Sequence, residues 1–558
     1  MTEQRPSSSK LFSRWDIILA ILAGVLTLEL YVRTIVPWVL PFDSSEFQVL
    51  AYQVGLAHGT GYPVFILLAK LFITLVPVGE VAYRVSLFST FMGALTVTGT
   101  YLCAKLLSKS RWAAFIAAFA LAVSNTFWSR SIIADVHSTA AAFLVAVWLA
   151  LLIWYKSGNQ RALFAVGLCG GLGLGLHGTF AVVAPAVGIF LLLNWNRWKE
   201  LWKPALLGVL AGVVAFLCVY AVVDLHAPPA NIWNASYGPA RSAWKLSEAD
   251  IKNPLKRAKF MLLAGQWNRD MFANPAEDMP ASLSDYKGQL PRELVPMTLG
   301  LALLGLVILF VRDWRSAALF AAALIAHWVF FFNFRVMGMY VYYIPGYIWI
   351  AMLAAVGASW IGWLIGKIPL RSIQRVLQPV VMLALLAMCV VPMLSPTWKA
   401  VQKGQSPFIG QDGYWVQSDT GPNIKLCPGW SVRLSRMPSC SRPGTSFINT
   451  GTPRTFSKNA PTCALSNRFR TISRSHCPTQ RSNSFARTLT RIRSTCIRSS
   501  PKWKTPVSSC ASCLLPGFNS TKSKNHNATS STAQGIGREA QCSCVEKVAG
   551  DSSLTFDV

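Results

Sequence analysis

The chain has few acidic residues and few charged residues of any kind. Of its 558 residues only 23 are Asp or Glu, against 52 Lys or Arg, and charged residues make up 13% of the sequence. Hydrophobic residues make up 53%, and the mean hydropathy is +0.40. This composition excludes an ordinary water-soluble domain and predicts an all-α polytopic membrane protein.

Acidic residues are absent between Asp419 and Glu539, a stretch that carries 19 Lys and Arg. Without those 19 charges the net charge of +29 falls to +10, which is ordinary for a membrane protein with basic loops. The excess of positive charge therefore does not indicate a nucleic-acid partner.

Cysteines with metal-ligand spacing are also lacking. Four of the 13 cysteines lie in apolar segments and nine lie beyond residue 420 at irregular spacings. The pairs Cys510/Cys513 and Cys542/Cys544 have no matching second pair and no His ligands, so no zinc site is predicted. No cleavable signal peptide is expected, because residues 1–14 form a short basic lead into an uncleaved first span.

Long apolar runs are abundant, and each is near the roughly 20 residues needed to cross a bilayer. They predict about eleven transmembrane helices, near residues 16–39, 84–104, 112–128, 138–155, 162–178, 179–195, 204–225, 293–311, 316–334, 340–366 and 376–395.

The apolar segment 62–77 is an exception. It is bounded by Pro63 and Pro77, carries Lys70 near its middle and reaches only about 24 Å as a helix, short of the roughly 30 Å hydrocarbon core. We predict an interfacial or re-entrant helix, because a spanning helix here would turn the downstream basic loops outward, against the positive-inside rule. The choice decides on which side of the membrane thirteen basic residues lie: Lys105, Lys109, Arg111, Lys156, Arg161, Arg197, Lys199, Lys203, Arg312, Arg315, Lys367, Arg371 and Arg375.

The topology that follows has a cytoplasmic N-terminus and an outer C-terminus. A transmembrane domain is expected over residues 1–395, with outer interfacial helices over 44–77 and a long outer loop over 226–292. Residues 396–419 would form an outer connector. Asp43, Arg84 and Arg335 all come out near the outer surface.

Residues 420–558 have a different character, rich in Ser, Thr, Arg, Pro and Cys with no persistent apolar period. A basic disordered tail and a folded cysteine-rich domain are two interpretations. The scattered Cys, Trp and Phe favour a third, a reading-frame shift near 418–428, which resequencing of the gene would test.

The first outer loop carries the best candidates for chemistry, in residues 42–47 (FDSSEF). Asp43 and Glu46 have the spacing of a helix N-cap and its third residue, and apolar residues at helical spacing predict an amphipathic helix over 44–57. A capping role and a catalytic role are both open, and they are compatible.

Residues 58–63 (HGTGYP) predict a turn with two glycines before a helix that begins at Pro63. The turn either only links two interfacial helices or approaches a ligand headgroup, with His58 and Lys70 supplying positive charge. Tyr62 belongs to the same candidate surface.

Ionisable residues also gather at the outer end of the fourth predicted span, as Arg130, Asp135 and His137. Such residues at a membrane boundary indicate either function or a helix cap. His177 reads as a packing residue, and Tyr340, Tyr342 and Tyr343 as interfacial tyrosines.

Three motifs together resemble one family: residues 42–47, 58–63 and 77–87 (PVGEVAYRVSL). The resemblance is to bacterial membrane proteins formerly of unknown function, related to the eukaryotic transmembrane protein O-mannosyltransferase and placed in the GT-C glycosyltransferase superfamily. It covers residues 30–200 and continues more weakly to about 415. Gly59 and the 135–137 triplet depart from the family pattern, which usually has Pro after the His and an acid-x-Tyr. The tail does not resemble the family's outer domain.

The resemblance implies a GT-C-like bundle that transfers a sugar, such as mannose, from a polyprenyl phosphate to a protein or glycan hydroxyl, with inversion. By analogy Asp43 is the base, and Glu46 binds a hydroxyl or orients the helix. His58, Lys70, Arg84 and Arg130 are the phosphate candidates. Asp135 is a second candidate acid, and Tyr62 and His137 complete the donor site. No metal or other cofactor is required, and the location implied is the bacterial inner membrane.

A polytopic transporter or lipid flippase is the alternative. Such a protein should show internal repeats and symmetrically broken helices near mid-membrane. No convincing repeat is present, and the polar residues gather at one face, which favours the enzyme.

Overall fold

The computed structural model describes residues 11–40, 43–198, 202–336, 338–402, 423–427 and 430–433. The chain divides into two compact units, Met1–Arg442 and Pro443–Val558, and all described residues lie in the first. The sequence predicts that residues 420–558 differ in character from the rest of the chain, and almost all of these residues lie outside the described part.

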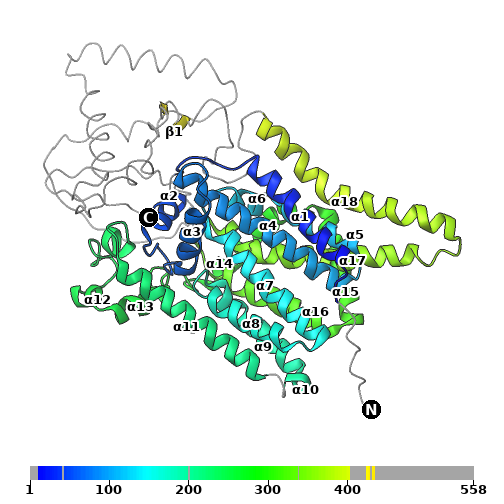
Figure 1. Ribbon diagram of the computed structural model, residues 1–558, viewed down its shortest axis with the longest axis horizontal. Coiled ribbons are helices and arrows are strands. Elements are labelled where there is room, and N and C mark those ends of the chain that lie inside the picture. The colour runs from blue at the N-terminus through cyan, green and yellow to red at the C-terminus, as the bar shows by residue number, and fades with distance from the viewer. Residues whose placement is uncertain are drawn as a thin grey trace, which may run out of the picture. The chain divides into compact units, whose positions relative to one another are not determined.

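The first unit is a bundle of α-helices with one short strand pair (Figure 1). The elements are α1 (Arg14–Val32), α2 (Asp43–Gln53), α3 (Pro63–Leu75), α4 (Val81–Ser108), α5 (Arg111–Ala122), α6 (Asn125–Ser131), α7 (Val136–Ser157), α8 (Gln160–Gly173), α9 (Thr179–Leu193), α10 (Trp195–Trp198), α11 (Trp202–His226), the π-helix η1 (Trp233–Tyr237), α12 (Glu248–Lys252), α13 (Pro254–Leu262), α14 (Pro275–Glu293), α15 (Pro296–Arg312), α16 (Trp314–Phe331), the 3₁₀-helix η2 (Met339–Tyr343), α17 (Ile344–Ile365), α18 (Arg371–Gln402), β1 (Asn423–Cys427) and β2 (Trp430–Arg433).

Among the described residues, seven helices are long and apolar enough to cross a membrane, and up to nine if each bent pair is one span. The predicted count of eleven is therefore not confirmed. Two predicted spans correspond to the shorter helices α8 and α9, and the predicted span 112–128 is bent by 69° between α5 and α6. Periodicity shows that these segments are apolar, but it does not show where a helix breaks.

Glycines let two pairs of helices approach to backbone contact. On α8 and α11, a Cβ added at Gly208 would lie 2.1 Å from the carbonyl oxygen of Phe164. On α15 and α17, a Cβ at Gly357 would lie 2.0 Å from the carbonyl oxygen of Leu301. Small residues at such contacts are typical of helix packing in membranes, where van der Waals contact must replace the hydrophobic effect.

One end of the bundle gathers the N-terminal turn of α1 and many of the basic residues. Asp16 of α1 pairs with Arg111 at 2.7 Å and lies 3.9 Å from Lys105 at the end of α4. At the same ends of the helices, Lys156 of α7 pairs with Asp313 at 2.7 Å. We call this the basic end.

The other end is covered by α2 and α3. The C-terminal half of α3 reaches Arg84 in the first turn of α4, which donates to the carbonyl of Ile73 at 2.6 Å. The first turn of α3 meets the turn after α8, where Val64 donates to the carbonyl of Gly175 at 3.2 Å. Both ends of α3 thus contact elements at this end of the bundle, and its interfacial or re-entrant placement stays a prediction.

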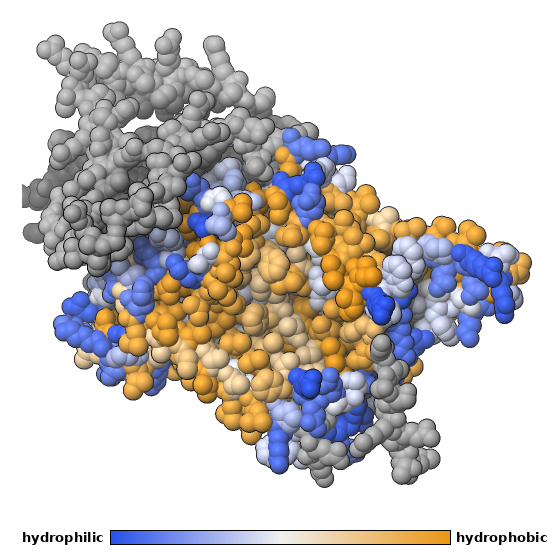
Figure 2. Space-filling view, viewed as in Figure 1, coloured by the Kyte–Doolittle hydropathy of each residue, from blue (hydrophilic) through white to orange (hydrophobic). Residues whose placement is uncertain are grey.

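The surface between the two ends is apolar. Figure 2 shows a broad hydrophobic area over the middle of the helices, with hydrophilic residues gathered toward their ends. Large side chains within the long helices, such as Leu207, Leu303 and Val307, are exposed. An exposed apolar surface of this extent fits contact with lipid, and the chain is an integral membrane protein.

Helix α18 continues to Gln402, so the helical part extends beyond residue 395 into the predicted connector. Beyond residue 420, β1 and β2 form an antiparallel pair in which Asn423 faces Arg433. The three interpretations of residues 420–558 stay predictions.

Candidate functional site

Asp43, Glu46 and His58 form a cluster at the start of α2. Glu46 accepts a hydrogen bond from the backbone N–H of His58 at 2.9 Å, and its other oxygen makes a short contact with His58 Nδ1. His58 Nε2 faces the carboxylate of Asp43 at 3.8 Å. Helix α2 places the two carboxylates one turn apart, so one imidazole reaches both.

The two carboxylates differ in availability. The side chain of Asp43 is 66% exposed and that of Glu46 is 24% exposed. Glu46 holds the turn that follows α2, while Asp43 presents an oxygen to solvent. Helix α2 begins at Asp43 and ends at Gln53, so Asp43 is its first residue and the helix is shorter than the predicted 44–57.

His58 is held in its charged form. Burial lowers the pKa of His58, but the negative charge and hydrogen bond of Glu46, followed by the charge of Asp43, raise it to about 9. The His58 ring is therefore an imidazolium at neutral pH.

The turn at 58–63 depends on its glycines. Gly59 has φ +65° and Gly61 has φ +82°, a region that other residues adopt at a cost. The N–H of Gly59 donates to Oε1 of Gln266 at 2.9 Å, which also accepts from the hydroxyl of Tyr237 at 2.6 Å. Both partners lie in the long 226–292 loop, so this loop holds the His58 turn in place.

A second cluster surrounds Asp135 at the start of α7. Its carboxylate accepts from the backbone N–H of His137 and contacts His137 Nδ1, both at 2.7 Å, and Nη1 of Arg130 lies 3.2 Å away. Arg130 also makes a short hydrogen bond to the hydroxyl of Tyr340. Although burial raises the pKa of Asp135, the charges of His137 and Arg130 hold it well below its usual range. Asp135 is both a helix cap and an ion-pair partner.

Aromatic residues connect the two clusters. The ring of Tyr62 contacts His58 at a centroid distance of 5.6 Å and stacks on His177 at 6.5 Å. His177 in turn lies 5.0 Å from His137, and Tyr342 contacts both histidines. Burial, reinforced by His137, lowers the pKa of His177 to about 3, so His177 is neutral.

His177 and Tyr342 are thus part of the site, although the sequence indicated a packing role for His177 and an interfacial position for Tyr342. Each is a single residue in an apolar segment far from Asp43 in sequence. The available signal was that both fall at the same predicted outer face as Asp43.

Two of the predicted phosphate-binding residues, Lys70 and Arg84, hydrogen-bond to backbone carbonyls outside the two clusters. Lys70 donates to the carbonyl of Tyr52 at 2.8 Å, and Arg84 donates to the carbonyl of Ile73. Each satisfies carbonyls near the end of a neighbouring helix, α2 or α3. These contacts favour a structural role for both over a role in phosphate binding.

A cavity of about 470 Å³ opens beside the second cluster. It lies between α14 and the segment around η2, and Tyr340 is part of its wall. Its charged lining consists of Asp285, Arg292 and Arg335. The cavity therefore has a net positive lining next to the Arg130–Tyr340 hydrogen bond.

The ligand atoms of Asp43, Glu46 and His58 lie within 4.8 Å of one another, close enough to hold a metal ion. A metal would need neutral His58, because only the free imidazole nitrogen binds it. With a pKa near 9 for His58, a proton competes for that position at neutral pH. We therefore treat the cluster as an ion-paired triad.

The fold and site define a polytopic helical membrane protein with an exposed carboxylate at one end of its bundle. Residues 43–202 match the family described as the N-terminal domain of the protein O-mannosyl-transferase TMEM260. This match contains α2, the His58 turn and the Asp135 cluster. The resemblance predicted from the motifs is confirmed for this segment.

Curated relatives of the same name match a similar part of the chain. The Mus musculus protein O-mannosyl-transferase TMEM260 is 33% identical over 214 residues, which is 37% of this chain and 29% of the relative. The Dictyostelium discoideum protein of that name is 28% identical over 157 residues, 28% of this chain and 19% of the relative. The matches thus span less than a third of these relatives.

Two solved structures are similar at low identity. ArnT from Cupriavidus metallidurans, bound to undecaprenyl phosphate, aligns with a TM-score of 0.44 and 15% identity over 71% of this chain and 73% of its own. The Archaeoglobus fulgidus oligosaccharyltransferase aligns with a TM-score of 0.41 and 15% identity over 69% and 56%.

Proposed function

We propose that this protein is a GT-C-type glycosyltransferase that moves a sugar from a polyprenyl-phosphate donor to a hydroxyl acceptor. The observation that carries the proposal is the Asp43 carboxylate, which is exposed and held at the start of α2 within the segment that matches the family. The names of the relatives support a hexose such as mannose and a protein acceptor.

Asp43 is the proposed general base. As the acceptor oxygen attacks the anomeric carbon, its proton passes to the Asp43 carboxylate and the bond from that carbon to the phosphate oxygen breaks. Attack from the face opposite the leaving group inverts the anomeric centre. Asp135 is less suited to the role because its oxygens are already occupied by Arg130 and His137.

The leaving group is a polyprenyl phosphate, whose negative charge needs a positive surrounding. Protonated His58 lies beside Asp43. Arg130 donates a hydrogen bond to Tyr340, which is part of the wall of the 470 Å³ cavity. Arg292 and Arg335 add two guanidinium groups to that cavity, and a planar guanidinium suits a phosphate. We propose that the donor phosphate lies between these groups.

The orientation belongs to the same proposal. The N-terminal turn of α1 shares the basic end with Lys105 and Lys156, so the positive-inside rule places that end in the cytoplasm. The site then faces the outer side of a bacterial inner membrane, where a lipid-linked sugar and its acceptor would meet.

The test compares membranes containing the intact protein with membranes containing Asp43→Asn, each supplied with radiolabelled polyprenyl-phosphate hexoses. Loss of the general base should lower sugar transfer by about 10² to 10⁴-fold, with unchanged expression. The control is Glu277→Gln, an exposed carboxylate in the first turn of α14. Equal transfer by the wild type and Asp43→Asn would refute Asp43 as the base.

A further inference from the structure

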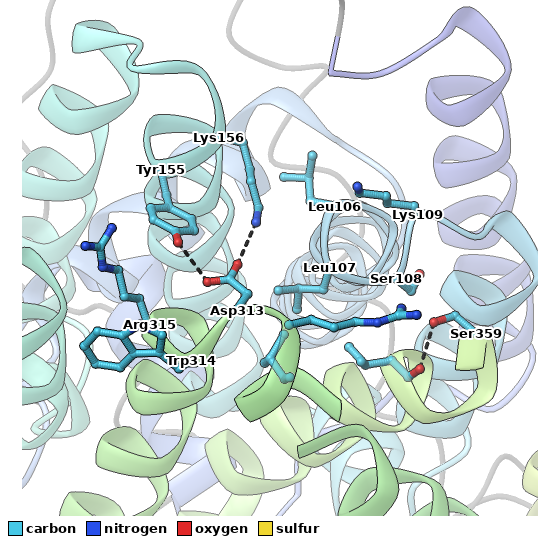
Figure 3. A pocket seen from close by; sticks show the side chains of 13 residues that line it. Leu106, Leu107, Ser108, Lys109, Tyr155, Lys156, Asp313, Trp314, Arg315 and Ser359 are labelled. Carbon is cyan, nitrogen blue, oxygen red and sulfur yellow. Dashed lines mark hydrogen bonds and ion pairs between the residues drawn. The ribbon is translucent and has the colours of Figure 1, made fainter. Parts of the chain in front are cut away.

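A second cavity, of about 630 Å³, lies at the basic end of the bundle, away from the site described above (Figure 3). It is enclosed by the ends of α4, α7 and α15 and by parts of α16 and α17. His137 near one end of α7 belongs to the candidate site, and Lys156 near the other end lines this cavity. The two are about 28 Å apart along the helix axis, at 1.5 Å per residue.

The lining of this cavity is strongly basic. Lys109, Lys156, Arg312 and Arg315 line it, and Asp313 is its one acidic lining residue. The carboxylate of Asp313 is already occupied, because it accepts from Lys156 at 2.7 Å, from the hydroxyl of Tyr155 at 2.8 Å and from Ser316. Figure 3 shows Tyr155 and Lys156 both directed at it.

Three cations remain without a carboxylate. Lys109, Arg312 and Arg315 have no acidic side chain within 4.0 Å among the described residues, although eleven such pairs occur elsewhere in them. Nε of Arg315 is buried and has no hydrogen-bond partner in the described part of the chain.

The aromatic surroundings place this cavity at a membrane surface. The guanidinium of Arg312 lies over the rings of Trp360 and Trp363, at 4.7 and 5.6 Å from their centroids, and Arg315 lies 5.8 Å from Trp314. Trp314 is 52% exposed. Tryptophans at the ends of spanning helices are typical of the lipid headgroup region.

Apolar side chains complete the cavity. Leu106, Leu309 and Val356 line it together with the cations. A ligand with an anionic group and an apolar part would contact both kinds of wall, whereas a small inorganic anion would leave the apolar wall uncovered.

We propose that this cavity binds the phosphate headgroup of an anionic membrane phospholipid, at the opposite end of the bundle from the glycosyl-transfer site. Arg312 and Lys109 bind the phosphate, and the apolar wall receives the first carbons of the lipid. Basic pockets between transmembrane helices are suited to such headgroups. The site is independent of the proposed transfer reaction.

The test is native mass spectrometry of the purified full chain in mixed micelles with equal amounts of phosphatidylglycerol and phosphatidylcholine. The wild type should retain phosphatidylglycerol in preference. Lys109→Gln with Arg312→Gln should weaken retention by roughly fivefold for each charge removed, about 25-fold together. The matched control, Arg371→Gln with Arg375→Gln, removes two exposed charges at the start of α18, at the same end of the bundle but outside the cavity.

If both double variants retain phosphatidylglycerol equally weakly, the effect comes from general surface charge and the proposal is overturned. Unchanged retention in the cavity variant would also overturn it. Competition with millimolar inorganic phosphate distinguishes the two sources of phosphate: displacement of the lipid would assign the cavity to a soluble anion and refute the lipid. Thermal unfolding of each variant checks folding. If the double variant unfolds early, the single variant Lys109→Gln, at an exposed position, replaces it, with an expected loss of roughly fivefold.

Discussion

At the scale of single residues, the pairing of His58 with Glu46 separates the roles of two carboxylates that look alike in the sequence. Glu46 contacts both the ring and the backbone N–H of His58. Asp43 lies 3.8 Å from the same ring and remains exposed. The structure thus favours a positioning role for Glu46 and leaves Asp43 available to a substrate.

The pairing predicts a pH-dependent contribution to stability. Because the folded pKa of His58, about 9, lies above its ordinary value of 6.5, the contribution is complete below pH 6.5 and is lost as pH rises through 9. Glu46→Gln should therefore lower the free energy of unfolding by roughly 2 kcal/mol at pH 6 and by much less at pH 10. Thermal unfolding at both pH values measures this. An equal effect at the two would contradict the charged pairing.

Gly59 gives a second prediction at this scale. Its φ of +65° disfavours any side chain, and an added Cβ would lie 3.0 Å from the Tyr62 hydroxyl. Gly59→Ala should cost roughly 1–2 kcal/mol of stability and lower transfer by displacing His58. Gly170→Ala on α8, where a Cβ would meet nothing within 4 Å, is the control for thermal unfolding and activity. Normal behaviour of both variants would show that the turn tolerates a side chain.

At the scale of elements, close contact between helices depends on glycine. On α17, Gly357→Ala would place a Cβ 2.0 Å from the Leu301 carbonyl, so α15 and α17 must separate. We expect a loss of roughly 1–3 kcal/mol in thermal unfolding, as for other overpacked contacts. Gly300→Ala on α15 has no atom within 4 Å of the added Cβ and should unfold like the wild type. If the two variants unfold alike, the helices do not pack through Gly357.

The elements also show where sequence patterns stop being informative. The apolar run after Ser110 predicts one helix, yet the chain bends by 69° between α5 and α6. Buried Glu293 accepts from the N–H of Thr126 and from the hydroxyls of Ser124 and Thr126, which satisfies the start of α6. That partner comes from α14, more than 160 residues away, so no local pattern identifies it.

At the scale of the whole molecule, the gathering of basic residues with the N-terminal turn of α1 at the basic end predicts the orientation in the membrane. In a variant without native cysteines, Lys109→Cys should resist a membrane-impermeant maleimide applied from outside intact cells. Leu255→Cys, on α13 and 82% exposed, should be labelled. Labelling of position 109 from outside would reverse the topology and move the site to the cytoplasm.

The sequence by itself determined the membrane class and the motifs shared with the TMEM260 N-terminal domain, and it predicts a non-crossing helix at 63–75. These follow from composition, helix length and charge distribution, all of which are local. The tertiary structure alone decided that Glu46 engages His58, that His177 and Tyr342 join Asp135 to the His58 turn, and that Lys70 and Arg84 satisfy carbonyls of neighbouring helices. The physical reason is that an ion pair or a ring contact depends on the distance between side chains from separate elements, and packing sets that distance.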